Sequence, residues 1–472
     1  MKLLLVNPNF KGVVLVPSLG LGFIGTYLKK QTGCEVEIVE PILQGLSEDD
    51  VLKKAQQSDI IGLVCYTESR FQCFEFAQRL KQINPAARVI IGGPHVNTLD
   101  ELILRKYPFL DIVVRMEGEE AVSDIARGRP LVEISGITWR NQSGEIIKNT
   151  DRVMLEDIDA LGYDYSLVFS YLKKWKDSEI PHQLQRLNAI PIIGSRGCPF
   201  RCSFCAASGQ WGQSYRWLSP EELVGRIERL IAQYNIRYFR FYDALFIGTD
   251  ERILKFCDLI EKSKLDISFR IDIRAGTERE TLRRLRYAGC DVVGIGVESG
   301  SDRILERINK CITKKGVRQT LKICRELGYW IMGFFMISLP DETTEDMRQT
   351  LELFNLFDGI NLQIFKIHHN TTFYNELKQN GEIDDSVWFN PEYGITTRYG
   401  NEIYYCKDRF PSANFYWDEV SQFLKYAFFK FNVDNPSAII RNRGLMQGIP
   451  IISLSAFANT LLRYKTGKKL YL

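Results

Sequence analysis

The sequence lacks a strong excess of charge of either sign and lacks a long apolar run. Its 472 residues carry 61 Lys and Arg against 58 Asp and Glu, a formal net charge of +3. An excess this small gives no support to nucleic-acid binding as the main function. The apolar stretch after Met1 gives way at once to Asn7-Pro8-Asn9, so it is too short for a signal-peptide core or a membrane span.

The eleven cysteines are scattered and form no even framework in a short chain. This argues against a secreted disulfide scaffold and favours a cytoplasmic protein with a metal site. No internal repeat or low-complexity stretch is visible. The length by itself suggests two or three domains.

The region 1–150 alternates apolar strands with helical patterns. Near-continuous runs of Val and Ile separated by helices indicate a parallel sheet that is covered on both faces. The expected fold class is therefore α/β, and this first domain is expected to be Rossmann-like, of the doubly wound flavodoxin type. The expected strands are 2–8, 35–41, 59–66 and 87–94, and the expected helices include 17–31 and 69–82.

Residues 151–187 have a mixed composition and form the predicted linker, after which the alternation of strands and helices restarts. Six units in 188–385 predict an open, partial (β/α)6 barrel, whose ligands would lie at the carboxyl ends of the strands. The region 386–472 does not continue the alternation of strands and helices, and we expect it to cap the barrel mouth. The six expected strands are 190–195, 238–243, 268–273, 291–298, 330–338 and 361–367.

One short motif carries the chemistry. Cys198, Cys202 and Cys205 are spaced C-x3-C-x2-C directly after the first strand of the second domain. Three thiolates on one loop can bind three irons of a cubane cluster and leave the fourth iron open to a ligand. The alternatives are free thiols or a zinc site, but zinc usually needs a fourth Cys or His, often from a second short pair. No such pair is present, so the spacing favours a [4Fe–4S] cluster.

The stretch CPFRCSFC resembles the signature of the radical S-adenosylmethionine (SAM) superfamily. The resemblance implies that Cys198, Cys202 and Cys205 hold the cluster, that its open iron chelates SAM, and that one electron yields a 5′-deoxyadenosyl radical. Phe204 matches the aromatic residue that lies near the adenine in this family. An external electron donor such as flavodoxin or ferredoxin is implied as a partner.

Further positions resemble family motifs in the same domain. Glu298 and Ser299 lie in a G-x-E-S-G-S segment, where the Glu would contact SAM; the alternative is a carboxylate that caps the helix near Asp302. Arg274 resembles an Arg that pairs with the SAM carboxylate; a surface role is the alternative, and Arg270 competes for the assignment. Asp243 lies where relatives carry an acidic pair or a polar strand end.

One turn of the barrel departs from the family pattern. Leu339-Pro340-Asp341-Glu342-Thr343 resembles the family's G-L-P-G-E-T turn, with both glycines replaced, by Ser338 and Asp341. We expect the turn itself to survive these replacements.

The first domain resembles the cobalamin-binding domain that precedes the barrel in a large radical SAM subgroup, and the likeness extends over nearly all of 1–370. Three turns carry it: P-S-L-G-L-G at 17–22, G-G-P-H at 92–95 and R-M-E-G-E at 115–119. Gly20, Gly22, Gly92 and Gly93 would let the backbone approach a corrin ring. The alternative is a scaffold in which these glycines serve only turns. The residues that the resemblance assigns to cobalamin are Leu19, Gly20, Gly92, Gly93, Glu117 and Gly118.

The first domain lacks a D-x-H-x-x-G motif, so no histidine is expected on the lower face of a bound corrin. His95 is its only histidine, and the simplest interpretation is a turn residue bonded to backbone. If cobalamin binds, we expect its nucleotide tail to be displaced.

The leading hypothesis is therefore a cobalamin-dependent radical SAM methyltransferase acting on a small-molecule substrate. The alternative is a dehydratase, epimerase or ring-forming enzyme whose first domain is structural, and an iron–sulfur electron carrier is a third. His368 and His369 follow the sixth strand and either act on substrate or form a satisfied polar pair. The basic end, 461–472, either touches an anionic membrane or is a solvated helix.

Overall fold

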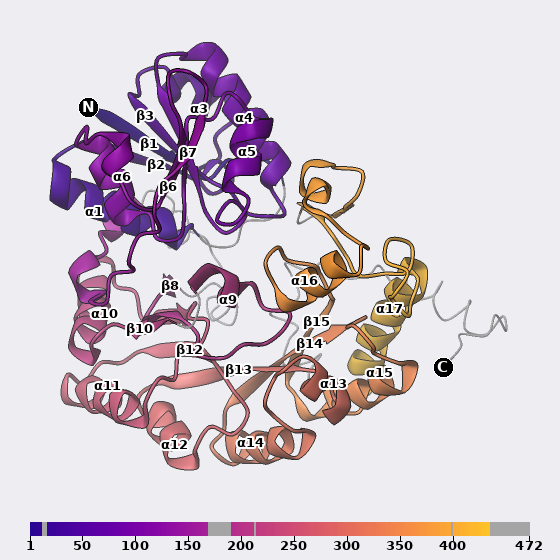
Figure 1. The fold of residues 1–472 in the computed structure, drawn as a ribbon. Coiled ribbons are helices and arrows are strands. Elements are labelled where there is room, and N and C mark those ends of the chain that lie inside the picture. The colour runs from indigo at the N-terminus through magenta and orange to yellow at the C-terminus, as the bar shows by residue number, and fades with distance from the viewer. Residues whose placement is uncertain (12–16, 169–189, 212–213, 398–399, 435–472) are drawn as a thin grey trace.

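The computed structural model describes residues 1–11, 17–168, 190–211, 214–397 and 400–434. Figure 1 shows the first domain above the barrel, with α9 between them and the C-terminal elements at one side. None of the helices in these described ranges combines the length and the hydropathy of a membrane span. The basic segment 461–472 lies outside the described residues.

The first domain is built on one seven-stranded sheet with the order β2-β1-β3-β4-β5-β6-β7. Its first five strands are parallel, which confirms the Rossmann-like prediction. They are β1 Lys2–Val6, β2 Glu35–Val39, β3 Ile60–Val64, β4 Arg88–Gly92 and β5 Ile112–Val114. The helices are α1 Leu19–Thr32, α2 Pro41–Gln44, α3 Glu48–Ala55, α4 Arg70–Ile83, α5 Asp100–Lys106 and α6 Glu119–Ala126.

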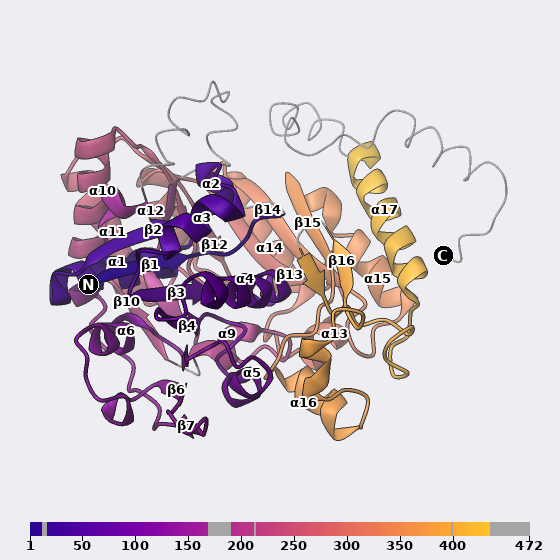
Figure 2. The same ribbon diagram turned by 90° about the horizontal axis from the view of Figure 1, so that it is seen from above.

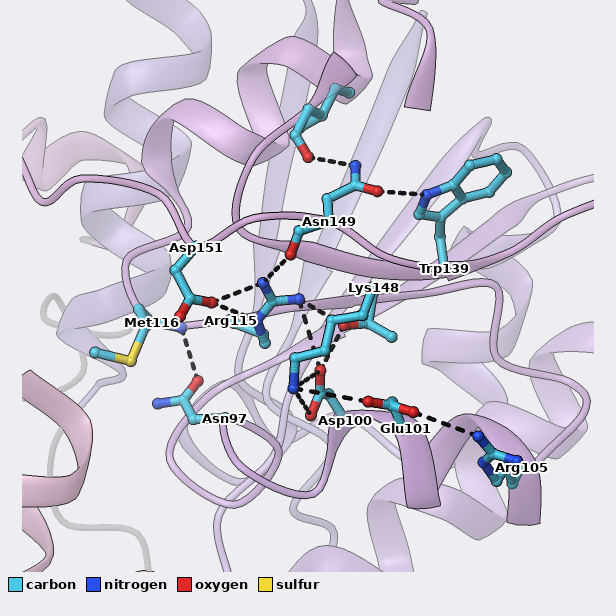
Figure 3. Close-up of polar contacts among 12 residues, drawn as sticks. Asn97, Asp100, Glu101, Arg105, Arg115, Met116, Trp139, Lys148, Asn149 and Asp151 are labelled. Carbon is cyan, nitrogen blue, oxygen red and sulfur yellow. Dashed lines mark hydrogen bonds and ion pairs between the residues drawn. The ribbon is translucent and has the colours of Figure 1, made fainter. Parts of the chain in front are cut away.

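Two antiparallel strands, β6 Ile137–Arg140 and β7 Ile146–Lys148, extend this sheet at the β5 edge. A charged network fixes them (Figure 3). The guanidinium of Arg115, whose side chain is 3% exposed, donates to Thr138 Oγ1 at 2.5 Å and to Asp151 Oδ1 at 2.8 Å. Lys148 on β7 pairs with Asp100 at 3.0 Å. Because a buried guanidinium needs its partners, Arg115 holds the hairpin on the sheet.

The turn that follows Arg115 has a residue other than glycine in the left-handed region of the backbone. Met116 has φ +62°, and its backbone N–H donates to Asn97 Oδ1 at 2.8 Å. The side-chain bond compensates the strain that a non-glycine residue has in this region.

The described part of the predicted linker, 151–168, packs on the first domain. It contains two 3-10 turns, η2 Asp159–Leu161 and η3 Tyr165–Leu167. The Tyr163 ring lies edge-on to Phe23 of α1, with centroids 4.7 Å apart, and Lys29 pairs with Asp164 at 2.8 Å. This segment is therefore part of the core of the first domain. The rest of the predicted linker lies outside the described residues.

The second domain is an open barrel of six parallel strands in the order β15-β14-β13-β12-β11-β8, which confirms the predicted partial (β/α)6 architecture. The strands are β8 Ile190–Ile192, β11 Tyr238–Phe241, β12 Ser268–Ile273, β13 Cys290–Glu298, β14 Trp330–Ile337 and β15 Gly359–Ile364. The helices are α10 Pro220–Tyr234, α11 Asp250–Lys262, α12 Arg279–Tyr287, α13 Asp302–Arg307, α14 Lys314–Glu326 and α15 Thr344–Leu351, with the turn η4 Phe354–Leu356 after α15.

A short antiparallel hairpin interrupts the barrel pattern near its start. β9 Ser195–Gly197 pairs with β10 Tyr215–Trp217, and α9 Ala206–Trp211 lies between them in the chain. The cysteine motif occupies the segment between β9 and α9.

The C-terminal region joins the barrel to the first domain (Figure 2). It comprises α16 Thr372–Gln379, η5 Asp385–Phe389, β16 Ile395–Thr397, β17 Gly400–Glu402 and α17 Trp417–Asp434. Arg70 at the start of α4 is fully buried and donates to the carbonyl oxygen of Trp388 at 2.9 Å and to that of Asn401 at 2.7 Å. It also donates to the Asn401 side chain at 2.8 Å and, within its own domain, to the Thr67 carbonyl at 2.6 Å. This guanidinium of the first domain is therefore satisfied mainly by the C-terminal region.

Candidate functional site

The cysteine loop is held in place by hydrogen bonds at Arg201 and Ser203. The N–H of Ser203 donates to the Ile308 carbonyl at 2.9 Å, and the Asn309 side chain donates to the Arg201 carbonyl at 2.8 Å. The N–H of Phe373, at the start of α16, donates to the Ser203 carbonyl at 3.3 Å. The loop is thus bonded to the end of α13 and to the C-terminal region.

The three thiols of Cys198, Cys202 and Cys205 are free and half-buried. Burial raises the pKa of Cys202 and of Cys205, and the charge of Lys310 opposes this rise at both. In the described ranges, no three His, Cys, Asp or Glu side chains close around a single metal ion. In a cubane each thiolate binds its own iron, so three thiols on one loop fit the predicted cluster.

Gly197, directly before Cys198, has φ +88°, and a Cβ there would lie 1.8 Å from the carbonyl oxygen of Ser214. We expect Gly197→Ala to push β9 away from β10 and to lower the iron content of the reconstituted protein. Gly276→Ala is the matched control, because Gly276 has φ +97° with open space around it. The control should lose only the roughly 1–2 kcal/mol of left-handed strain. Equal losses of unfolding free energy and iron in the two variants would contradict a steric role for Gly197.

Glu298 lies at the carboxyl end of β13 with φ +70°, and its Oε1 pairs with Lys310 Nζ at 2.8 Å. A Cβ at Gly296 would lie 2.8 Å from that oxygen and 2.9 Å from Lys310 Nζ, so Gly296 makes room for the pair. The Lys310 ammonium lies 5.9 Å from the centre of the Phe204 ring. The carboxylate therefore does not cap α13, and that alternative is wrong. Sequence reasoning missed Lys310, which no motif marks.

Arg274 lies beside the cysteine loop. Its guanidinium carbon is 3.7 Å from the centre of the Phe200 ring. Its charge opposes the rise that burial causes in the pKa of the Cys202 thiol. One of its terminal nitrogens is buried and has no hydrogen-bond partner among the described residues. The competing Arg270 lies four residues earlier on β12 and contacts Asp272 at 3.3 Å. Arg274 is therefore the better placed of the two to receive a ligand carboxylate, and its pairing with SAM stays a prediction.

Asp243 and Ser299 bond within the protein. The Asp243 carboxylate accepts the Gly194 N–H at 3.1 Å and the Ser195 hydroxyl. Burial raises the Asp243 pKa to about 6, although both bonds act to lower it. The Ser299 hydroxyl accepts the Ser301 N–H at 3.2 Å. Both residues hold loops at the site, and their predicted contacts with SAM stay predictions.

The turn after β14 survives the loss of its glycines. Ser338 and Asp341, which replace them, have φ +63° and +64°. Glu342 next to them is fully buried, and its Oε2 accepts the Leu339 N–H at 3.1 Å. Burial raises the pKa of Glu342 to about 8, so this side chain is protonated at neutral pH.

The raised pKa of Glu342 predicts how the stability of the folded protein depends on pH. Between pH 4.5 and about 8 the unfolded chain releases a proton that the folded chain keeps, so stability falls as pH rises, by about 1.4 kcal/mol per pH unit. Glu342→Gln should remove this slope and be more stable than the unsubstituted protein near pH 8. Urea unfolding across this pH range measures it, with the exposed Glu345→Gln as control. Parallel slopes in both proteins would show that Glu342 does not titrate in this way.

The four glycines that were predicted to let the backbone approach a corrin differ in the space around them. Gly20 has open space where a side chain would be, whereas a Cβ at Gly22 would lie 2.1 Å from Tyr163 Oη. At Gly93, with φ +105°, a Cβ would lie 2.8 Å from the Cys65 carbonyl oxygen, and at Gly92 it would lie 3.4 Å from that of Val114. The assignment of Gly22 to a corrin approach is wrong, because Tyr163 fills that space.

The loops after β1 and β4 carry buried polar atoms without partners in the described structure. They are Asn7 Oδ1, Asn9 Oδ1, His95 Nε2 and Asn97 Nδ2. Each would gain a hydrogen bond from a polar ligand at the carboxyl edge of the sheet. Cobalamin carries amide groups that donate and accept, so these loops fit it. Leu19 and Gly20 at the start of α1 lie at the same edge, after the strand β1.

His95 is not bonded to backbone through its ring, which corrects the sequence interpretation. Its Nδ1 lies 3.3 Å from Thr67 Oγ1, and its ring lies edge-on to Trp388, with centroids 5.9 Å apart. Burial and the charge of Arg70 hold its pKa well below the usual range. The ring is therefore neutral and packed against the C-terminal region.

Four charged side chains join the two domains next to the cysteine loop. Arg196 on β9 pairs with Glu117 at 3.1 Å and with Glu119 at 2.6 Å. Arg216 on β10 donates to both oxygens of Glu117, at 2.9 and 2.7 Å. These pairs lower the Glu117 pKa despite its burial. Glu117 was assigned to cobalamin; the structure gives it an interdomain role, while Gly118 caps α6.

The two adjacent histidines behave differently. His369 lies between the domains, with Nδ1 2.5 Å from Thr98 Oγ1 and Nε2 3.3 Å from Asp385 Oδ1. His368 is half-buried, and its pKa falls to about 4, first through burial and then through the charge of Lys366. His369 is thus a satisfied polar residue, as one alternative held.

Profiles of two known families match the chain. The Radical SAM superfamily matches residues 192–354, and the B12 binding domain matches residues 11–126. An uncharacterized methyltransferase of Pyrococcus horikoshii is 30% identical over 372 residues, which cover 76% of this chain and 78% of the relative. This chain is a radical SAM enzyme with a B12-binding domain. The family prediction is therefore confirmed, and the cofactors of this family are a [4Fe–4S] cluster, SAM and cobalamin.

Other relatives of this radical SAM enzyme carry different names. An anaerobic magnesium-protoporphyrin IX monomethyl ester cyclase of Rubrivivax gelatinosus is 26% identical over 75% of this chain, and the chain spans 65% of that cyclase. Among solved structures, the methyltransferase TsrM of Kitasatospora setae matches with a TM-score of 0.65 and 19% identity, covering 80% of this chain and 78% of TsrM. OxsB, with aqua-cobalamin bound, matches with a TM-score of 0.69 and 20% identity, covering 85% and 64%. These structures share the two-domain fold of this enzyme.

Proposed function

We propose that this radical SAM enzyme is a cobalamin-dependent methyltransferase that methylates carbon in a small-molecule substrate. The interdomain ion pairs are the observation that carries the proposal. Glu117 and Glu119 follow β5 at the carboxyl edge of the first sheet, and Arg196, their partner, lies two residues before Cys198. A corrin at that edge and a cluster on that loop would share one substrate.

The chain's own residues would position the cofactors. When bound, the cluster would supply the electron that splits SAM into methionine and a 5′-deoxyadenosyl radical, and cobalamin would supply a methyl group for transfer. Cys198, Cys202 and Cys205 would hold the cluster, and Arg274 would receive the SAM carboxylate with its unpartnered nitrogen. Glu298, kept in place by Lys310, would receive the ribose or the methionine part, and Phe204 would lie along the adenine.

The radical requires an external reductant, and we propose a flavodoxin or a ferredoxin for this role. All eleven cysteines are free thiols in the structure, which suits a reducing compartment. We therefore propose the cytoplasm as the site of action.

The test is anaerobic reconstitution with iron, sulfide and hydroxocobalamin, followed by SAM with a deuterated methyl group and a reductant. We expect iron–sulfur and corrin absorption in one protein, 5′-deoxyadenosine and S-adenosylhomocysteine as products, and the label on the corrin. Production of 5′-deoxyadenosine by a protein that retains no corrin would favour the dehydratase, epimerase or cyclising alternative. Absence of SAM cleavage by fully reconstituted protein would favour an electron carrier.

A further inference from the structure

The inner face of the barrel sheet is only half-buried along β11 and β14. Along β14 the burial alternates strictly, with half-buried residues facing inward and buried residues facing the helices. β11 shows the same alternation, and Gln363 on β15 is exposed. In a closed eight-stranded barrel the interior is filled by layers of side chains. This open six-stranded sheet instead has inward side chains on β11 and β14 that are only partly covered.

Two arginines lie side by side on that face. Arg240 on β11 and Arg270 on β12 are register partners in a parallel pair, so their side chains leave the sheet on the same side. The Arg270 guanidinium lies 5.6 Å from the ring of Phe334 on β14, which places it across the inner face. The Arg240 guanidinium lies 4.3 Å from the Tyr242 ring.

The charge of this pair is not balanced. Arg270 is 6% exposed and contacts Asp272 at 3.3 Å, whereas Arg240 has no acidic partner among the described residues. The Nε atoms of both arginines are buried without a hydrogen-bond partner. Burial lowers the pKa of Arg270, and the neighbouring charge of Arg240 adds to this.

The neighbouring strands do not supply the missing negative charge. β13 presents Gly294 to the inner face, where a Cβ would lie 2.1 Å from Asp272 Oδ1 and 2.7 Å from Phe334 Cε2. β14 presents Phe334 there. The described cluster thus holds two guanidinium groups, one carboxylate and one phenol, and two like charges held together in partial burial are costly unless an anion joins them.

We propose that Arg240 and Arg270 bind the anionic group of the substrate, a carboxylate or a phosphate, inside the barrel. Guanidinium groups bind such oxyanions through paired N–H donors, and each of these two arginines has an Nε–H without a partner to contribute. The inference rests on the proposed function, since it names the class of molecule that would be methylated.

The position of Arg240 and Arg270 in the barrel indicates which part of the substrate they would bind. Arg270 lies on β12, four residues before Arg274, which directly follows the strand, so the two are roughly 13 Å apart along the chain direction. The anion would therefore be remote from the reacting carbon near the cysteine loop. Binding energy from such a remote group serves to orient the reacting part of a substrate.

The test measures anion binding without turnover. Protein reconstituted with cluster and cobalamin, and saturated with SAM, is titrated calorimetrically with inorganic phosphate and, separately, with succinate. We expect one of the two to bind and to raise the thermal midpoint. Arg240→Gln and Arg270→Gln should weaken its affinity at least tenfold, and Arg240→Lys should weaken it less. Binding of phosphate alone would indicate a phosphorylated substrate, and binding of succinate alone would indicate a carboxylate.

The matched control is Arg237→Gln, three residues before Arg240 and exposed at the start of the strand, where its side chain donates to the Asp266 carbonyl. It should leave anion affinity unchanged. In anion-free buffer, Arg240→Gln should be at least as stable as the unsubstituted protein, because it removes a like-charge contact. Binding of neither anion, equal weakening in the control, or a lower anion-free midpoint in Arg240→Gln would overturn the proposal. None of these outcomes bears on methyl transfer, which the corrin-labelling experiment tests separately.

Discussion

Replacing Cys198, Cys202 or Cys205 by alanine should reduce 5′-deoxyadenosine formation to background. Each of these thiols would bind a different iron, so removal of one leaves that iron without its protein ligand. The loop around them is bonded to Ile308 and Phe373 through backbone groups that the substitutions do not touch. We therefore expect the variants to fold and to keep cobalamin while they lose iron–sulfur absorption. Product analysis after anaerobic reconstitution, with iron and sulfide counted, measures the effect.

The matched control for this prediction is Cys34→Ala, which removes a half-buried thiol after α1 in the first domain. It should retain the iron content and the SAM cleavage of the unsubstituted protein. Retention of a SAM-cleaving cluster in any of the three loop variants would refute the assignment of the ligands.

Arg196→Met should produce the largest loss of stability among the variants considered. The substitution keeps an apolar stem but leaves Glu119, 3% exposed, without its cationic partner. Breaking a buried pair from one side typically costs about 3–5 kcal/mol. Arg216 still pairs with Glu117 across the domain boundary, so we expect the contact between the domains to weaken without global unfolding. Methylated product should then fall by a larger factor than 5′-deoxyadenosine, since only transfer between the cofactors needs both domains.

A double-mutant cycle separates the pair from other effects of Arg196→Met. Combined with Glu119→Gln, the variant no longer contains the unpaired buried carboxylate, so part of the lost stability should return. Arg318→Met, at an exposed position of α14, should change the thermal midpoint little. Additive losses for Arg196→Met and Glu119→Gln would contradict the proposed coupling.

Local signals in the sequence explain why much of the barrel could be predicted. Ser219 accepts the Glu222 N–H and precedes Pro220, and Thr249 accepts the Arg252 N–H. Both are N-cap signals, and they mark the starts of α10 at Pro220 and of α11 at Asp250. The cysteine motif is equally local, since its three thiols lie within eight residues.

The contacts that sequence reasoning missed join residues far apart in the chain. Gly22 meets Tyr163 across the first domain, and Glu117 meets Arg216 across the domain boundary. A turn motif does not reveal such partners, so Gly22 was assigned to a corrin and Glu117 to a cofactor contact. The strands β6 and β7 are short and depend on Arg115, whose bonds to Thr138 and Asp151 no periodicity predicts.

Arg70 limits how this enzyme can be divided. Its guanidinium lies inside the first domain, but Trp388 and Asn401 from the far end of the chain satisfy most of it. A fragment cut after residue 150 would expose that group's empty hydrogen-bonding sites together with the apolar surface around them. We therefore expect that transplanting this first domain into another protein would require the distant C-terminal loops that carry Trp388 and Asn401.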